Sequence, residues 1–464
     1  MKKPNNISFQ FACFLLCAIL WAASADPQYQ NFINCFVNNS SNSAVISTPD
    51  TSSYSSILNV SIQNLRFTLP NTPKPQLILT PQNEAHIQTA LYCSQKHKLQ
   101  VRILSGGHDF EGSSYVSNVS FFVLNMYNFR SISVDSINKT AWVGAGATLG
   151  ETYYNIVQAN SSLAFPAGYY PQVGIGGHIS GGGYGCLVRK FGLAADNVLD
   201  ARVIDAEGRI LNRASMGEDL FWAIRGGTGA SFAVILEYKV KLVEIPKEQL
   251  TAFSLKRTLE QNATDLVHKW QTVGPNLPPE LLLELQLTVV PSNQTADGKT
   301  IQATFVSLFL GGADDLVSIM NQNFPELGLV RDDCITLSRW VDFITYFYQR
   351  PLNLTDTILT SRVSLNPKSY FKSTSEFVQN PIPKQGLEQL WDVMRNISSP
   401  PVLMNWTPFG ARMAEIPESE IPFPHRAGNI YMVFKKIQWQ GTDPDLIQER
   451  FASARRLTSF FGSM

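Results

Sequence analysis

The 464-residue sequence predicts an α+β fold built from two lobes. A strand–helix–strand pattern over residues 76–103 ends at a glycine-rich loop, as in a βαβ unit, where ligands often bind. Apolar strand patterns at 281–290 and 301–310, interleaved with helical ones, indicate a second lobe after a boundary at Ile245-Pro246. We therefore expect a first domain over residues 26–246 and a second over residues 247–464.

Within the first lobe, the sequence predicts a short buried strand at 76–79 and a helix after it. Thr80 is a suitable N-cap, and Pro81 suits the first helical turn because its missing N–H would have no partner there. The next predicted strand, at 100–103, runs directly into the loop at 105–108. This order places the loop at the carboxyl end of the sheet.

The charge balance excludes some partners. Lys and Arg together number 37, as do Asp and Glu, so the net charge is zero. Because the chain shows neither a basic patch nor a block of like charges, we expect no nucleic-acid partner and no binding to an anionic membrane.

The N-terminus has the layout of a signal peptide over residues 1–25. Two lysines, Lys2 and Lys3, precede an apolar run at 11–20, and the small residues 23–25 provide a cleavage site after Ala25. The run is short for a membrane span, and no other segment is apolar enough to be one. We expect a secreted protein, outside the cell, in the cell wall or in the vacuole.

Export agrees with the cysteine and glycosylation patterns. Cys13 and Cys17 leave with the signal peptide, so the mature chain keeps four cysteines and at least one disulfide, with several pairings open. The four are Cys35, Cys93, Cys186 and Cys334. N-glycosylation motifs occur at Asn38, Asn39, Asn59, Asn118, Asn138, Asn160, Asn262, Asn293, Asn353, Asn396 and Asn405.

Two glycine clusters are the strongest candidates for a binding site. One is Ser105-Gly106-Gly107-His108-Asp109, and the other spans Gly174 to Gly185. Backbone without side chains can approach phosphate oxygens closely and donate several N–H groups to them. Neither cluster is a Rossmann fingerprint or a Walker loop. From the residues alone, nucleotide binding and plain tight turns both stay open.

Seven motifs follow one another along the chain. They are SGGHDFEG at 105–112, WVGAGATLG at 142–150, FPAG at 165–168, GGHISGGGYG at 176–185, RKFGLAADN at 189–197, MGEDLFWAIRGG at 216–227 and FPHRAG at 423–428. Together they resemble the plant berberine bridge enzyme-like oxidases, of the vanillyl-alcohol-oxidase/p-cresol-methylhydroxylase flavoprotein superfamily. The resemblance covers about residues 30–450, and it implies a PCMH-type FAD-binding domain and a substrate domain of antiparallel sheet with helices.

The resemblance assigns cofactor-binding residues in both glycine clusters. His108 matches the histidine whose ring nitrogen is bonded to the 8α carbon of the flavin. In much of the family a cysteine makes a second link, but Tyr170 holds that position here, so we expect one covalent link only. Cys186 lies nearby and is interpreted as a small buried residue. The other implied FAD contacts are Ser105, Gly106, Gly107, Asp109, Gly176, Gly177, His178, Ser180, Gly181 and Gly182.

The resemblance also assigns three further roles. Val173 falls at a gatekeeper position where the family pattern associates valine with oxygen access. Tyr184 matches a tyrosine close to flavin and substrate. Cys35 and Cys93 match the family's disulfide pair.

The implied function is oxidation of a small alcohol, carbohydrate or specialised metabolite. The flavin accepts a hydride while an enzyme base takes a proton, and O2 reoxidises the flavin to give hydrogen peroxide. No metal is expected, and the protein is expected to be a monomer.

Some departures from the family pattern favour an alternative. Phe110 replaces a tyrosine, and Phe434 lies where relatives place a Glu or Gln over the flavin. Relatives also continue into a Tyr-x-Asn-x-Arg-Asp segment, so we expect a truncated, incomplete C-terminal segment. The alternative is a catalytically inactive secreted glycoprotein that keeps the fold.

Overall fold

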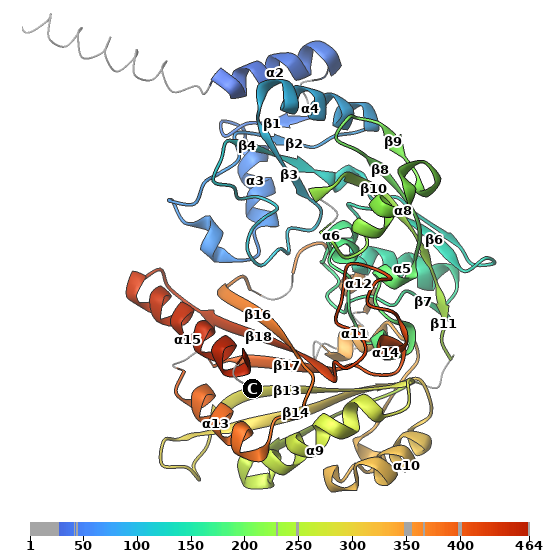
Figure 1. Cartoon of the computed structure of the whole chain (residues 1–464), viewed down its shortest axis with the longest axis vertical. Coiled ribbons are helices and arrows are strands. Elements are labelled where there is room, and N and C mark those ends of the chain that lie inside the picture. Colours follow the sequence, from blue (N-terminus) through green and yellow to red (C-terminus); the bar gives the residue numbers. More distant parts are fainter. Residues whose placement is uncertain are drawn as a thin grey trace, which may run out of the picture.

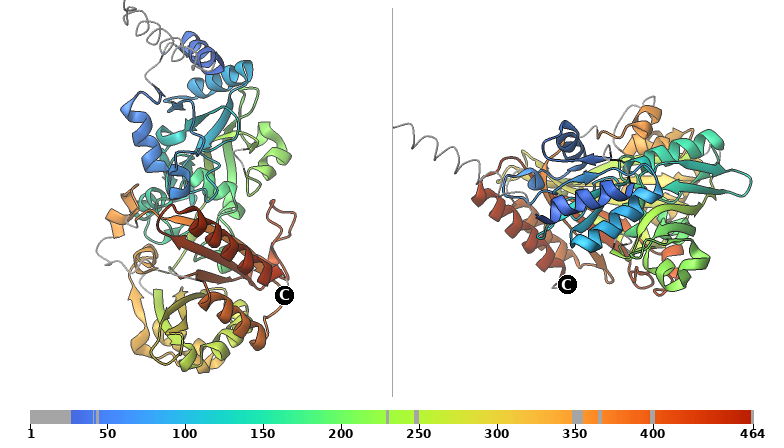
Figure 2. Two further views of the ribbon diagram at one scale, coloured as in Figure 1. Left: turned by 90° about the vertical axis from the view of Figure 1, so that its left-hand side faces the viewer. Right: turned by 90° about the horizontal axis from the view of Figure 1, so that it is seen from above.

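The computed structural model describes residues 27–40, 42, 45–228, 231–246, 250–347, 355–364, 367–397 and 401–462. The expected signal peptide and the motif at Asn353 lie outside these residues. Two parts are stacked along the long axis of the molecule, with the N-terminal half above and the C-terminal half below (Figure 1). Figure 2 shows the same stacking from two further directions.

The first sheet of the upper part contains the predicted βαβ unit. Its order is β1-β2-β4-β3, and β4 lies parallel to both of its neighbours. The predicted crossover therefore joins β2 to β3 with β4 inserted between them. The elements are β1 (Ile46–Ser47), β2 (Ile78–Leu79), α4 (Glu84–His97), β3 (Gln100–Leu104) and β4 (Phe121–Asn125).

The prediction that Thr80 is the N-cap of α4 is wrong. Asn83 is the N-cap, and its side chain accepts a hydrogen bond from the backbone N–H of His86 at 3.0 Å. The Thr80 backbone N–H instead donates to the Val45 carbonyl, which keeps Thr80 extended beside the sheet. Asn is as good an N-cap as Thr, and the helix begins at the later of these two residues.

A second, antiparallel sheet completes the upper part in the order β5-β6-β10-β8-β9. The chain between 234 and 244 contains two strands, β10 and β11. The elements are β5 (Ile132–Asp135), β6 (Thr140–Gly144), β8 (Val198–Ile204), β9 (Ile210–Leu211), β10 (Val234–Lys241), and the pair β7 (Leu163–Ala164) and β11 (Val243–Glu244).

The lower part is built on a seven-stranded antiparallel sheet in the order β15-β12-β14-β13-β17-β18-β16. The two strands predicted at 281–290 and 301–310 are β13 and β14, paired along their whole length. The strands are β12 (Leu250–Thr258), β13 (Leu281–Pro291), β14 (Lys299–Phe309), β15 (Ile335–Leu337), β16 (Tyr370–Val378), β17 (Leu403–Pro408) and β18 (Tyr431–Trp439).

The two faces of this sheet have different partners. Leu283 and Leu285 of β13 belong to an apolar cluster with helices α9 (Ala263–Asn276), α13 (Lys384–Arg395) and α15 (Pro444–Gly462). Leu282 belongs to a second cluster that includes residues of the upper part, such as Val143 and Ile175. Side chains alternate across a strand, so Glu284 also faces the upper part.

The remaining helices cover the upper part or lie between the two parts, except α10 (Ala313–Asn323), which packs in the apolar cluster of the lower part. They are α2 (Pro27–Ser40), α3 (Ser52–Ser61), α5 (Leu149–Ala159), α6 (Ile175–Ser180), α7 (Val188–Phe191), α8 (Arg213–Ala223), α10 (Ala313–Asn323), α11 (Asp342–Phe347), α12 (Thr355–Thr360) and α14 (Arg412–Glu415). Within the described ranges, no helix combines the length and apolar character that a membrane crossing requires.

The expected disulfide between Cys35 and Cys93 is present and joins α2 to α4, with Cα atoms 5.8 Å apart. Cys186 is buried, as expected, and burial raises the pKa of its thiol to about 12. Cys186 is therefore a neutral thiol at physiological pH.

Candidate functional site

The two glycine clusters line one cavity of about 520 Å³ in the upper part of the molecule. Of the residues assigned in advance, the cavity collects Ser105, Gly106, Gly107, His108, Asp109, Val173, Gly176, Gly177, His178, Ser180 and Gly181. Two assigned residues, Gly182 and Tyr184, are not among its described lining. Loops separated by about seventy residues are thus brought to one site.

Close backbone contact between the two loops explains several glycines. A Cβ atom on Gly106 would lie 2.3 Å from the backbone nitrogen of Gly174, and one on Gly174 would lie 2.1 Å from the Ser105 hydroxyl. Gly107 has a φ of +73°, which favours glycine. The Ser105 hydroxyl donates to the Ala145 carbonyl at 2.6 Å and ties the loop to the second sheet.

Gly177 has a different environment, because a Cβ atom there would meet no protein atom within 4 Å. Gly177 lies on α6 and lines the cavity, so a side chain at this position would project into the cavity. The Ser180 hydroxyl donates to the Gly176 carbonyl at 2.6 Å. This wall of the cavity is therefore bare backbone, which allows a flat, phosphate-bearing ligand to approach closely.

His108 is held as a neutral imidazole. Burial lowers its pKa to about 4, and the positive charges of Lys368 and Lys436 act in the same direction. A hydrogen bond to the backbone of Gln172 opposes them. A neutral imidazole keeps one ring nitrogen with a free electron pair, which is the form that can bond to carbon.

His178 is neutral for a similar reason, since burial lowers its pKa to about 4. Its Nε2 accepts a hydrogen bond from the Gly168 backbone N–H at 3.0 Å. His178 thereby fixes the chain just before Tyr169 and Tyr170, and it connects the cavity to those two tyrosines.

A buried carboxyl group that the sequence analysis did not single out lies beyond these tyrosines. Glu284 of β13 is 1% exposed, and its Oε1 accepts hydrogen bonds of 3.0 Å from both Tyr169 and Thr407. Burial raises its pKa to about 7. A lone carboxylate in the apolar run Leu-Leu-Leu-Glu-Leu at 281–285 was a signal that could have revealed it.

Comparison with known proteins agrees with this geometry. A family model for an FAD binding domain matches residues 75–213. Tetrahydroberberine oxidase of Berberis wilsoniae is 47% identical over 93% of this chain and 81% of that protein. Berberine bridge enzyme-like 8 of Arabidopsis thaliana is 44% identical over 96% of this chain and 84% of that protein.

The chain belongs to the berberine bridge enzyme-like family of FAD-linked oxidoreductases. The solved structure of berberine bridge enzyme-like 28 from Arabidopsis thaliana superimposes with a TM-score of 0.82 at 41% identity, covering 94% of this chain and 84% of that one. The expected fold class is therefore confirmed: an FAD-binding PCMH-type part and an antiparallel sheet with helices.

Two positions at which this berberine bridge enzyme-like protein departs from the family pattern contact each other. The rings of Phe110 and Phe434 lie 5.8 Å apart, and Phe110 also contacts Phe371 at 5.5 Å. Phe110 follows the His108 loop, whereas the other two lie on the lower sheet. The substituted positions thus form an apolar contact between the two parts of the molecule.

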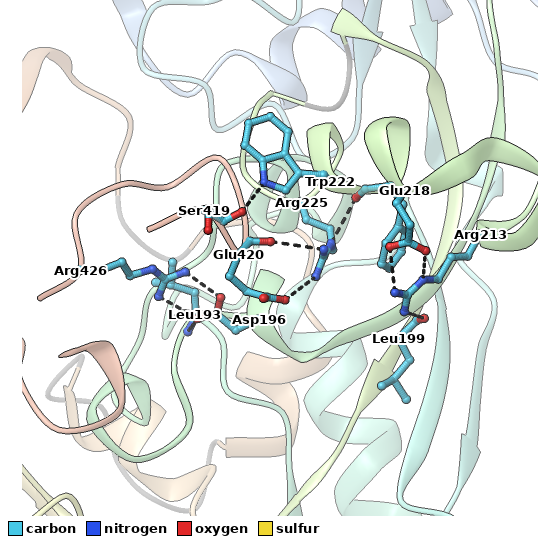
Figure 3. Close-up of polar contacts among 11 residues, drawn as sticks. Leu193, Asp196, Leu199, Arg213, Glu218, Trp222, Arg225, Ser419, Glu420 and Arg426 are labelled. Atoms are coloured by element: carbon cyan, nitrogen blue, oxygen red, sulfur yellow. Dashed lines mark hydrogen bonds and ion pairs between the residues drawn. The ribbon is translucent and has the colours of Figure 1, made fainter. Parts of the chain in front are cut away.

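Residues of three motifs that carry the family resemblance also form a polar clamp between the two parts (Figure 3). Arg426 pairs with Asp196, whose Oδ2 also accepts from the Leu193 backbone at 2.8 Å. Nearby, the Trp222 indole donates to the Ser419 carbonyl at 2.8 Å. These contacts fix the 419–426 segment against the FAD-binding part.

Proposed function

We propose that this protein is a secreted FAD-dependent oxidase with FAD attached through His108 alone. Its substrate is a small alcohol, carbohydrate or specialised metabolite, and its electron acceptor is O2. The observation that carries the proposal is the single cavity lined by both glycine loops together with His108. We also assign residues 26–246 to FAD binding and residues 247–464 to the substrate.

The described residues fit FAD in three ways. Gly177 leaves one wall open to a flat ligand, Ser105 and Ser180 place hydroxyl groups at the wall, and His108 presents a neutral ring nitrogen. Tyr170 holds the position of the family's second link, and a phenol cannot make the thioether that a cysteine makes. These features support attachment at one residue.

When bound, FAD would supply a hydride acceptor for the substrate and would pass the electrons to O2, giving hydrogen peroxide. Val173 lines the cavity, and its short side chain leaves room for O2 there. We assign the substrate proton to Tyr184, because this partly exposed residue matches the family tyrosine close to flavin and substrate.

Secretion and glycosylation complete the proposal. Eight of the motifs lie on exposed asparagines of the described surface: Asn38, Asn39, Asn59, Asn118, Asn138, Asn262, Asn293 and Asn396. Asn405 is different, since it is buried in β17 and leaves no room for a glycan. We therefore exclude Asn405 from the glycosylation sites.

Peroxide production tests the proposed activity. The full chain, made in a secretory host, is incubated in air with tetrahydroberberine, a cinnamyl alcohol and glucose, one probe for each substrate class. The proposal expects hydrogen peroxide with at least one probe, and slower reoxidation of the flavin by O2 in Val173→Leu. If the protein carries flavin but none of the probes reduces it, the alternative of a catalytically inactive glycoprotein is favoured. The apolar contact between Phe110 and Phe434 supports that alternative.

A further inference from the structure

Glu284 is a buried acid that the proposed chemistry does not yet use. One of its oxygens, Oε1, is held by Tyr169 and Thr407, while Oε2 is buried and has no hydrogen-bond partner among the described residues. Burial of a carboxyl group without a cationic partner costs free energy. Glu284 is therefore a candidate functional residue.

The phenols of Tyr169 and Tyr184 lie next to this acid. The Tyr169 hydroxyl donates to Glu284 Oε1 at 3.0 Å, and the Tyr184 phenol interacts with that of Tyr169. Tyr184 is partly exposed, Tyr169 is 4% exposed and Glu284 is 1% exposed. Exposure to solvent therefore falls from Tyr184 to Glu284, and the series of groups leads into the protein interior.

We propose that Glu284 is the final proton acceptor for Tyr184, reached through Tyr169, during the oxidation assigned above. This inference rests on the proposed function. A proton leaves the substrate O–H or acidic C–H for Tyr184 Oη, the Tyr184 proton moves to Tyr169 Oη, and the Tyr169 proton moves to Glu284 Oε1. Bound FAD would accept the hydride, both phenols end neutral, and one proton has moved.

Tyr184 needs such a partner, because burial raises its phenol pKa well above the usual range. A phenolate left at this position would be strongly disfavoured, and Tyr184 alone is a poor base. Glu284 has a pKa of about 7, so it is largely ionised in mildly alkaline solution and can accept the proton. It contacts no substrate and acts only through Tyr169.

The neighbours of Glu284 do not compete for this role near neutral pH. The titratable groups on which the charge of Glu284 acts are Tyr169, Tyr170, Tyr184 and Cys186. Each has a raised pKa and is neutral at pH 7. Within the described part of the chain, no salt bridge to Glu284 is formed.

The test compares Glu284→Gln, Glu284→Asp and the matched surface control Glu280→Gln, whose residue pairs with Lys190 at 2.9 Å. Stopped-flow spectroscopy measures flavin reduction by tetrahydroberberine, or by whichever probe of the panel reacts, across pH.

We expect the wild-type rate to rise with a midpoint near pH 7. In Glu284→Gln this midpoint disappears and the rate falls about a hundredfold at pH 8, with KM changed by less than about threefold. Glu284→Asp keeps a titrating step, and Glu280→Gln behaves as wild type. A Glu284→Gln enzyme with the wild-type rate and midpoint overturns the proposal.

A second measurement needs no substrate and separates this inference from the proposed function. Infrared difference spectra of the flavin-loaded protein, taken from about pH 5 to about pH 9, report protonated carboxyl groups. We expect a carboxylic acid band that titrates near pH 7 in the wild type and is missing in Glu284→Gln. If no such band exists, Glu284 cannot be the acceptor, even when the enzyme oxidises a probe. If the band is present but no probe reacts, the proposed activity fails instead.

Discussion

Arg426 and Asp196 form a buried ion pair, with Nη2 and Oδ1 2.7 Å apart and Nη1 and Oδ2 3.0 Å apart. The Arg426 side chain is fully enclosed and that of Asp196 is 5% exposed. Two parallel hydrogen bonds of this kind fix both the distance and the orientation of the partners. Because Arg426 follows β17 and Asp196 belongs to the FAD-binding part, the pair holds the lower part against the upper.

The first prediction concerns the stability of this clamp. Arg426→Ala leaves Asp196 buried without a counter-charge, which destabilises the protein by about 3 to 5 kcal/mol. The free energy of unfolding in urea measures this loss. Arg412→Ala is the control, since its pair with Glu415 is exposed and contributes less than about 1 kcal/mol. Equal losses for the two variants would show that the buried pair has no special role.

The second prediction concerns the disulfide. Cys35 and Cys93 close a loop of 58 residues, and loss of that constraint on the unfolded chain costs about 4 kcal/mol. The double variant Cys35→Ser, Cys93→Ser is therefore expected to unfold at a clearly lower urea concentration. Cys334→Ser, which changes a partly exposed free thiol, is expected to unfold as wild type. An unchanged midpoint in the double variant would contradict the expectation.

The third prediction separates cofactor binding from folding. Gly177→Val fills open space in the cavity rather than clashing with protein, so the protein is expected to fold but to retain less than about a tenth of the wild-type flavin. Flavin absorbance per protein measures binding, and circular dichroism checks the fold. Gly462→Val is the control, because its Cβ also meets open space but lies at the end of α15. Full flavin loading of Gly177→Val would place FAD elsewhere.

The fourth prediction is a loss of stability in acid. The pKa of His178 is lowered from 6.5 to about 4 in the fold, so the unfolded chain binds a proton that the folded chain does not. Its contribution is complete above about pH 6.5 and is lost as the pH falls toward 4. Protonated Nε2 also cannot accept from Gly168. Urea unfolding at several pH values measures the slope.

A matched pair of variants checks the assignment of that slope. His178→Gln keeps an acceptor for the Gly168 N–H but does not titrate, so it is expected to reduce the slope between about pH 6.5 and about pH 5, leaving the part due to His108, whose pKa burial also lowers to about 4. His268→Gln, on α9, is expected to leave the slope as in the wild type. A wild-type slope in His178→Gln would assign the acid sensitivity to other groups.

Much of the architecture followed from local sequence patterns. The glycines of both loops and the long strands β13 and β14 were predictable because their spacing or conformation demands particular residues. The start of α4 was not, because Thr80 and Asn83 are both acceptable caps and only packing decides between them.

Packing between distant segments also limited what could be predicted of the site from the sequence. The motifs named His108 and the loop residues, but not Glu284, because its neighbours Tyr169 and Thr407 come from segments more than a hundred residues away. Contacts of this kind depend on how β13 faces the upper part. The contact between Phe110 and Phe434 is equally nonlocal, and each residue looked like an isolated departure in the sequence.

Covalent attachment of FAD to His108 is the central claim, and one measurement tests it most directly. The secreted chain and its His108→Ala variant are denatured and separated by electrophoresis, and flavin fluorescence is recorded in the protein band, with His97→Ala as control. The account predicts fluorescence in the wild type and in His97→Ala and none in His108→Ala. Fluorescence that persists in His108→Ala, or a wild-type band without flavin, would contradict a single link through His108.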